Sequence, residues 1–209
     1  MMVNAYQLKR RVYDHESMYF HYPIAGQSTA EHILSSYRAD QKFTHEEARL
    51  LDLCLLVHAD HGGGNCSTFT TRVLSSSGTD TYAAISAAIG ALKGPKHGGA
   101  NLKVMHQLDY ILANVEHPED DGEVREMLRK IIRKEAGDGS GLIYGMGHAV
   151  YTLSDPRAQI LKNHARSLAY KKGYDEEYNM LCSIERLAPE IFAEEKHGPK
   201  KVCANVDLF

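Results

Sequence analysis

Apolar residues recur along most of this sequence at the spacing of a helix face, and this periodicity constrains the fold more than any other feature. Thr44-His-Glu-Glu47 has the form of a capping box, in which a threonine and a glutamate satisfy the first backbone N–H groups of a helix. Behind it, Leu50, Leu53, Cys54 and Val57 fall at i, i+3, i+4 and i+7, with more leucines between them. The pattern predicts a deeply buried helix.

The rest of the chain shows the same period, with the usual start and stop signals of helices. Asp155-Pro156 is typical of an N-cap followed by a proline at the first helical position. Ser67–Val73 has the β-branched residues of a strand, but no second run is available to pair with it. We therefore expect that segment to be helical and the fold class to be all-α. The other expected helices cover residues 79–92, 101–112, 119–136, 155–173 and 175–191.

Alanine dominates the expected helix from Thr79 to Leu92, which stops at the helix-ending pair Gly94-Pro95. Small side chains let two helices approach closely but fill little of a core by themselves. We therefore expect this helix to pack against another subunit and the protein to be a homodimer. The alanines are Ala83, Ala84, Ala87, Ala88 and Ala91.

Composition argues against several classes of function. A formal net charge of −3 does not fit a nucleic-acid binder with a basic surface, and no run approaches the roughly 18 apolar residues of a membrane helix. The N-terminus lacks the apolar run of a signal peptide. Cysteines form no CxxC pair, which fits reduced thiols. We expect a cytoplasmic protein with no membrane or nucleic-acid partner. The cysteines are Cys54, Cys66, Cys182 and Cys203.

Two glycine-rich loops interrupt the helical pattern, and each places a histidine beside flexible backbone. Gly94–Asn101 contains His97, and Gly137–Gly147 precedes His148. Glycine lets backbone N–H groups approach a ligand closely. Neither the G-x-G-x-x-G spacing of dinucleotide-binding loops nor a Gly-Lys pair is present, which argues against nucleotide loops of those kinds.

Polar side chains beside these loops and helix ends favour enolate chemistry on an anionic compound. His97 precedes a predicted helix, whose dipole disfavours imidazolium, and a neutral imidazole N–H can stabilise an enolate oxygen. Arg157 can form a bidentate pair with a carboxylate. Apolar neighbours of Asp207 would raise its pKa toward that of a general base.

His58-Ala-Asp-His61 leaves a metal site open as an interpretation. Its two imidazoles at i and i+3 share one helix face. The i, i+4 spacing and the intervening glutamate of a zincin helix are absent. We expect no metal, and a histidine-rich metal-binding bundle is an alternative.

Several motifs, in this order, match one known family. They are His58-Ala-Asp-His61 with Asn65 and Ser67-Thr68, then Gly90-Ala-Leu-Lys-Gly-Pro-Lys-His-Gly-Gly-Ala-Asn101, Gly145-Met-Gly-His-Ala-Val-Tyr151, Asp155-Pro-Arg-Ala158 and Asn205-Val-Asp207. Each is a weak signal alone, but together they extend from residue 58 to residue 207. The sequence resembles citrate synthases, multi-helical all-α enzymes that condense acetyl-CoA with oxaloacetate to give citrate and CoA.

The resemblance implies a role for each matching residue. Asp207 would remove a proton from the acetyl methyl group, His97 would hydrogen-bond the thioester carbonyl, and His148 would polarise the ketone of oxaloacetate and protonate the new alkoxide. His61 and Arg157 would hold the oxaloacetate carboxylates. No permanently bound cofactor is implied, because acetyl-CoA is a cosubstrate. Its adenine would rest on the backbone of Leu142, Ile143, Tyr144, Gly145, Met146 and Gly147.

The sequence also departs from the family. Thr152 stands where a basic residue often serves the CoA phosphates, and family chains are much longer at both ends. The resemblance therefore implies a fragment: residues 1–97 from the large dimerisation domain, 98–204 as the small domain and 205–209 as the start of the return to the large domain. Further substrate-binding arginines would lie beyond Phe209, and we expect Asp207, so near the chain end, to be poorly positioned. We expect these 209 residues alone to be slow or inactive.

Two further alternatives stay open. A 2-methylcitrate synthase, which uses propionyl-CoA, differs by a change of pocket too small to read from one sequence. The second is a non-catalytic helical dimerisation module.

Overall fold

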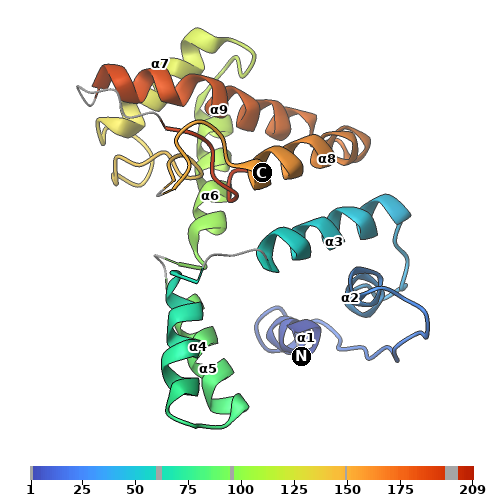
Figure 1. Ribbon diagram of the computed structural model, residues 1–209. Coiled ribbons are helices and arrows are strands. Elements are labelled where there is room, and N and C mark those ends of the chain that lie inside the picture. Colours follow the sequence, from blue (N-terminus) through green and yellow to red (C-terminus); the bar gives the residue numbers. More distant parts are fainter. Residues whose placement is uncertain (1, 60–62, 95–96, 149, 196–201) are drawn as a thin grey trace. The chain divides into compact units, whose positions relative to one another are not determined.

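The computed structural model describes residues 2–59, 63–94, 97–148, 150–195 and 202–209 (Figure 1). Throughout these residues the chain is all-α, as predicted, and its one pairing of extended backbone is an isolated antiparallel bridge between Met146 and Ala204. None of the helices described is long and apolar enough to cross a membrane. The helices are α1 (Met2–Tyr13), α2 (Thr29–Tyr37), α3 (His45–Ala59), α4 (Cys66–Ser76), α5 (Thr81–Leu92), α6 (Ala100–Asn114), α7 (Asp121–Ile132), α8 (Pro156–Lys172) and α9 (Asp175–Glu195).

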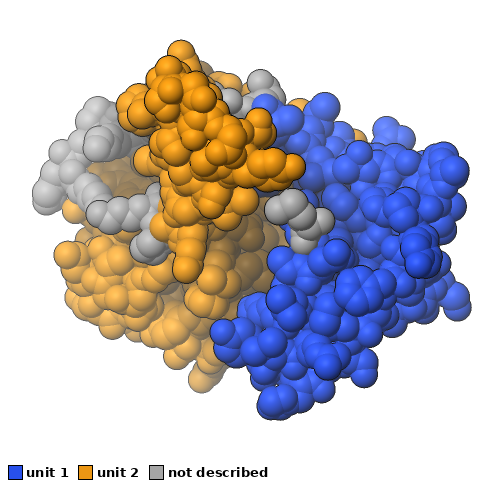
Figure 2. Space-filling view, turned by 90° about the horizontal axis from the view of Figure 1, so that it is seen from below, with its two compact units in different colours: residues 1–60 blue, residues 61–209 orange. Residues whose placement is uncertain are grey.

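The chain divides into two compact units, residues 1–60 and 61–209, which Figure 2 colours separately. The first unit contains α1 to α3, and the second contains α4 to α9. The expected domain boundary near residue 97 lies inside the second unit, between α5 and α6. A division into a large and a small domain at that point stays a prediction.

In the first unit, α3 begins at the capping box that the sequence predicts. The Glu47 N–H donates to Thr44 Oγ1 at 3.2 Å, and the Thr44 N–H donates to the Glu47 carboxylate at 2.7 Å. Arg38 adds two hydrogen bonds to the same carboxylate. The expected deep burial of α3 is wrong, since Leu56 is 63% exposed. Within its unit α3 packs mainly against α2, which covers one of its faces.

In the second unit, α4 and α5 form a helical hairpin (Figure 1). The Asn65 side chain caps α4 by accepting from the Thr68 N–H at 2.9 Å, and Asp80 caps α5 in the same way. Residues 67–73 are therefore helical, as expected despite their β-branched side chains. The hairpin buries few of its apolar residues: Phe69 is 63% exposed and Ile89 is 54% exposed.

The core of the second unit forms where α6, α7 and α9 pack together. The apolar stripe predicted on α7 is buried throughout, as is most of the stripe on α9. Ion pairs from α7 to α9 flank the core; Arg125–Glu190 and Arg129–Glu194 are both 2.7 Å long. Ile143 from the glycine loop and Leu208 from the C-terminal segment join the same core. This shared core anchors both segments beside each other.

Candidate active site

The end of the glycine loop pairs with the C-terminal segment. The Gly147 N–H donates to the Cys203 carbonyl oxygen at 2.8 Å, and the Asn205 N–H donates to the Gly145 carbonyl oxygen at 2.9 Å. Gly145 has a φ of +80°, and a Cβ at this position would lie 2.7 Å from Leu208 Cδ1. Glycine is therefore required by both the backbone conformation and the close approach of Leu208.

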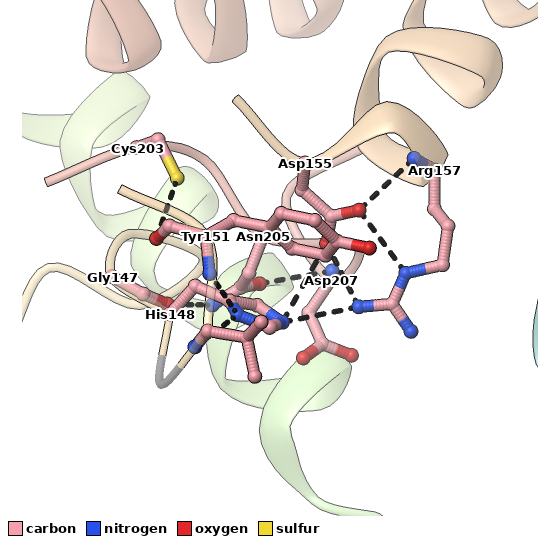
Figure 3. A network of polar contacts seen from close by, with 9 residues as sticks. Gly147, His148, Tyr151, Asp155, Arg157, Cys203, Asn205 and Asp207 are labelled. Atoms are coloured by element: carbon pink, nitrogen blue, oxygen red, sulfur yellow. Dashed lines mark hydrogen bonds and ion pairs between the residues drawn. The ribbon is translucent and has the colours of Figure 1, made fainter. Parts of the chain in front are cut away.

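Asp207 is half-buried in a turn that this pairing holds. Its N–H donates to Asn205 Oδ1 at 3.0 Å (Figure 3), and its carbonyl oxygen accepts from Asn101 Nδ2, at the start of α6, at 3.3 Å. The next residue, Leu208, is 1% exposed. The backbone of Asp207 is thus held on both sides, whereas we expected a residue so near the chain end to be poorly positioned.

The ring of His148 is oriented by two backbone donors. The N–H groups of Val150 and Tyr151 donate to His148 Nδ1 at 2.9 and 3.0 Å. A ring nitrogen that accepts carries no proton, so a neutral imidazole that accepts at Nδ1 has its hydrogen on Nε2. This Nε2 lies 3.1 Å from Arg157 Nη2 and 3.8 Å from Asp155 Oδ2. Arg157 Nη2 is also a donor, so a neutral ring accepts either from the two backbone N–H groups or from Arg157. In the first case the Nε2–H and the guanidinium are both donors, and an acceptor between them, such as the carbonyl oxygen of an anionic compound, would suit the pair.

Asp155 orients the guanidinium of Arg157. Its side chain caps α8 by accepting from the Arg157 N–H at 3.0 Å, and its two oxygens accept from Arg157 Nε at 3.1 Å and Nη2 at 2.8 Å (Figure 3). Burial pushes the pKa of Asp155 upward, but the hydrogen bonds and charge of Arg157 outweigh burial and hold that pKa below its ordinary value. Asp155 is therefore a carboxylate at neutral pH, and it fixes the plane of the arginine fork.

His97 belongs to a different chain of hydrogen bonds, in the turn before α6. Its Nε2 lies 2.9 Å from Ser67 Oγ, and this hydroxyl donates to Asn65 Oδ1 at 2.8 Å. A serine hydroxyl has one hydrogen to give to either neighbour, so its orientation decides which nitrogen of His97 carries the proton. Ser67 is thus placed to select the tautomer of His97.

The loop from Leu142 to Gly147 is tied to α6 on its other side. The Tyr144 N–H donates to Gln107 Oε1 at 3.0 Å, and the Tyr144 hydroxyl donates to Asp138 at 2.7 Å. Lys103 of α6 pairs with Asp138 at 3.0 Å. Hydrogen bonds from Ser140, Tyr144 and Lys103 hold the pKa of Asp138 well below its ordinary value. A cavity of about 240 Å³ lies between α6 and this loop.

Of the predicted site residues, His148 and Arg157 are in direct contact, and the backbone of Asp207 is linked through the Asn205 amide to Gly147, the residue before His148 (Figure 3). Among the residues described, no contact joins His97 to this network, and its convergence on the same cleft stays a prediction. His61 lies outside the described residues. His58 Nδ1 is 2.7 Å from the Cys54 carbonyl oxygen, so this nitrogen is used within α3.

Three positioning groups escaped the sequence analysis. Asp155 was expected only to cap a helix, although a carboxylate two residues before an arginine is a usable signal for an ion pair. Ser67 and Asn205 were expected only as members of motifs. Their contacts reach across 30 and 58 residues of sequence, and no spacing rule predicts such contacts.

Comparison with known proteins agrees with the resemblance. Residues 1–209 match the family described as citrate synthase, C-terminal domain. A citrate synthase of Deinococcus radiodurans is 40% identical over 166 residues, covering 79% of this chain and 39% of that relative. A 2-methylcitrate synthase of Shewanella oneidensis is 35% identical over 162 residues, covering 77% of this chain and 37% of that relative.

A solved structure is similar over nearly the whole chain. It is the ternary complex of citrate synthase from Thermoplasma acidophilum with carboxymethyl-CoA and oxaloacetate, which is 30% identical with a TM-score of 0.73. The match covers 99% of this chain and 48% of that chain. The chain spans about two fifths of the length of the curated relatives it matches and about half the length of this solved one.

Proposed function

The chain belongs to the citrate synthase family, and from this membership we propose that the protein condenses acetyl-CoA with oxaloacetate and releases citrate and CoA. The network around His148 supports the proposal most directly. With its proton on Nε2, His148 would offer a donor beside the guanidinium of Arg157, which Asp155 orients. These groups suit a ketone flanked by a carboxylate, which is the chemistry of a 2-oxo acid.

In the proposed first step, Asp207 takes a proton from the methyl carbon of acetyl-CoA. The electron pair of the broken C–H bond moves toward the thioester oxygen, where a hydrogen bond from His97 stabilises the enolate. His97 can donate from Nδ1 only if the Ser67 hydroxyl donates to Nε2. Rotation of that hydroxyl is thus part of the proposed preparation of the site.

In the second step, the enolate carbon attacks the ketone carbon of oxaloacetate. The ketone oxygen takes the Nε2 proton of His148, and Arg157 and His61 hold the carboxylates. Water then hydrolyses the citryl thioester, so that citrate forms and the CoA thiol leaves. The loop Leu142–Gly147 would carry the CoA adenine, next to the turn that holds Asp207.

We also propose that the protein is a homodimer whose subunits meet at the hairpin of α4 and α5. Ile85, Ile89 and Leu92 follow one another at i, i+4 and i+7 on α5, and each is 46–54% exposed. A stripe of exposed apolar residues at this spacing is typical of a helix that packs against a partner. A second copy of the hairpin would cover it.

The proposed domain division and location follow the same family. We propose that residues 98–204 form a small domain that moves relative to residues 1–97. Residues 205–209, which we expected to begin the return to the large domain, pack against residues 98–204 through Leu208 and the bonds of Asn205. All four cysteines are free thiols, which fits the reducing cytoplasm that we propose as the location of the protein.

Release of free CoA tests the proposed activity. The purified protein is mixed with acetyl-CoA and oxaloacetate, and the new thiol is followed with DTNB. Release that depends on both substrates supports the proposal, whereas a faster reaction with propionyl-CoA favours the 2-methylcitrate alternative. No release with either thioester would count against activity of these 209 residues, as expected for a fragment without the further arginines or for a non-catalytic dimerisation module. Addition of the missing segments would then distinguish the two, because only the fragment would gain activity.

A further inference from the structure

Asn205 uses both ends of its side-chain amide to join two segments. Its Nδ2 donates to the Gly147 carbonyl oxygen at 2.9 Å, across 58 residues of sequence, and its Oδ1 accepts from the Asp207 N–H at 3.0 Å (Figure 3). Its backbone N–H donates to the Gly145 carbonyl oxygen, and its carbonyl oxygen accepts from the Leu208 N–H. One residue thus contacts the glycine loop twice and the Asp207 turn twice.

Each of the two segments also has an anchor of its own. Gln107 of α6 accepts from the Tyr144 N–H at 3.0 Å and so holds the loop. Leu208 is buried in the core, and Asn101 donates to the Asp207 carbonyl oxygen, so the turn is held as well. Neither segment depends on the Asn205 amide for its place in the fold. The amide adds a side-chain link between them, beside the backbone hydrogen bonds of Gly147 with Cys203 and of Asn205 with Gly145.

We infer that Asn205 is a positioning residue, which sets the Asp207 carboxylate relative to the loop that carries CoA. The inference rests on the proposed function. In that reaction the methyl group to be deprotonated is part of the same thioester whose adenine rests on the loop. If the loop and the turn are displaced relative to each other, the C–H bond of the methyl group is displaced relative to the Asp207 carboxylate that removes its proton. A displacement of about 1 Å at a reacting group can lower a rate by about 10².

Two variants distinguish the two hydrogen bonds of the Asn205 amide. Asn205→Ala removes both of them. Asn205→Ser keeps a short hydroxyl, which can still accept from the Asp207 N–H as serines do in turns, but it places no donor at the Gly147 carbonyl oxygen. The matched control is Asn114→Ala at the other end of α6, which removes an amide hydrogen bond of 2.8 Å to the Tyr110 carbonyl oxygen.

Kinetics with acetyl-CoA carrying a deuterated methyl group distinguish positioning from simple destabilisation. For Asn205→Ala we expect kcat to fall by about 10²-fold or somewhat less. The primary isotope effect should rise, because removal of the methyl proton becomes the slow step, while the KM for oxaloacetate stays within about twofold. Asn205→Ser should lie between this variant and the unchanged protein, and Asn114→Ala should change neither kcat nor the isotope effect. An unchanged kcat in Asn205→Ala, or a lower kcat with an unchanged isotope effect, overturns the inference.

Amide hydrogen exchange tests the link without turnover. In the unchanged protein the amides of residues 147 and 205 should exchange slowly, because both are hydrogen-bonded across the link. Both should exchange faster in the two Asn205 variants and remain slow in Asn114→Ala. If the unchanged protein releases no CoA from any thioester, the proposed function fails, and this exchange pattern still decides whether the link exists. Equal exchange in all four proteins overturns the link itself.

Discussion

The helices α6, α7 and α9 and the hairpin of α4 and α5 follow the same rules of sequence, yet they bury their apolar residues very differently. Ile111, Leu128 and Ile184 of the first group are completely buried. In the hairpin, Phe69 and Ile89 are more than half exposed. Each group contains a helix that begins at an aspartate cap: Asp120 caps α7, and Asp80 caps α5.

The difference shows that the signals that form a helix are distinct from the contacts that bury its apolar face. Caps and periodicity act within one or two turns of the chain, and both groups have them. Burial depends on what packs against the stripe. The helices α6 to α9 bury one another's apolar faces and lie beside the segments that carry His148 and Asp207. The apolar stripe of the hairpin is exposed in the single chain, and we propose that a partner covers it.

Asp207→Asn should abolish removal of the methyl proton and leave the fold of the helices α6 to α9 unchanged. The amide keeps the shape of the side chain but cannot accept the methyl proton. Loss of a general base typically costs about 10² to 10⁴ in rate. Steady-state release of CoA measures the loss, and oxaloacetate affinity by calorimetry should change little. Turnover within tenfold of the unchanged protein would show that another group is the base.

A pair of alanine substitutions compares the two regions directly. Ile184→Ala in the core should lower the free energy of unfolding by about 2–5 kcal/mol, because a fully buried side chain leaves a cavity. Ile85→Ala in the hairpin should change the free energy of unfolding by about 0.5 kcal/mol or less when the protein is dilute. Its effect should grow with protein concentration if a partner covers it. Urea unfolding at two concentrations measures both; equal losses at low concentration would erase the contrast.

Ile89→Glu tests whether a second subunit covers the hairpin. A carboxylate in the middle of an apolar contact would be buried without a cation, so the dimer dissociation constant should rise on the order of tenfold or more. Light scattering over a series of concentrations gives the mass. Tyr174→Glu introduces the same charge at another exposed hydrophobic residue, outside the hairpin, and should leave the mass unchanged. A stable monomer for the unchanged protein would refute the dimer.

The smallest expected effect is a pH dependence of the free energy of unfolding, and it comes from Asp155. Because Arg157 holds the pKa of Asp155 below its ordinary value in the folded protein, the unfolded chain binds this proton more readily. The contribution to stability is therefore present above the ordinary pKa and is lost as pH falls below about 5. Circular dichroism during acid titration should show a shallower loss of stability for Asp155→Asn. The matched Asp109→Asn, on the exposed surface of α6, should titrate like the unchanged protein, and identical curves for all three would contradict this assignment.

Sequence alone predicted the local features well. The all-α class, the Thr44–Glu47 capping box, the Asp155 cap and the buried stripe Val124–Ile132 all depend on residues within one or two turns of each other. The same rules failed for α3, whose leucines predicted deep burial but are half-exposed, with Leu56 63% exposed. Periodicity states how apolar a face is, and not whether another element lies over it.

Periodicity and capping rules could not predict the hydrogen bonds within the site. Motif order brought His148, Arg157 and Asp207 together through family resemblance, while Asn205 and Ser67 act on residues that lie far from one of their partners in sequence. Hydrogen bonds of this kind arise only once the core has placed Ile143 and Leu208 side by side. A single sequence contains no period or spacing that records them.

We propose that the glycine loop, the Asp207 turn and the two histidines form one condensation site. A crystal structure of the protein with oxaloacetate and carboxymethyl-CoA would show whether they do. We expect His148 Nε2 within hydrogen-bonding distance of the ketone oxygen, Arg157 on a carboxylate, and the carboxymethyl group between Asp207 and His97. Ligands bound elsewhere, or His97 and His148 on opposite surfaces of the molecule, would contradict it.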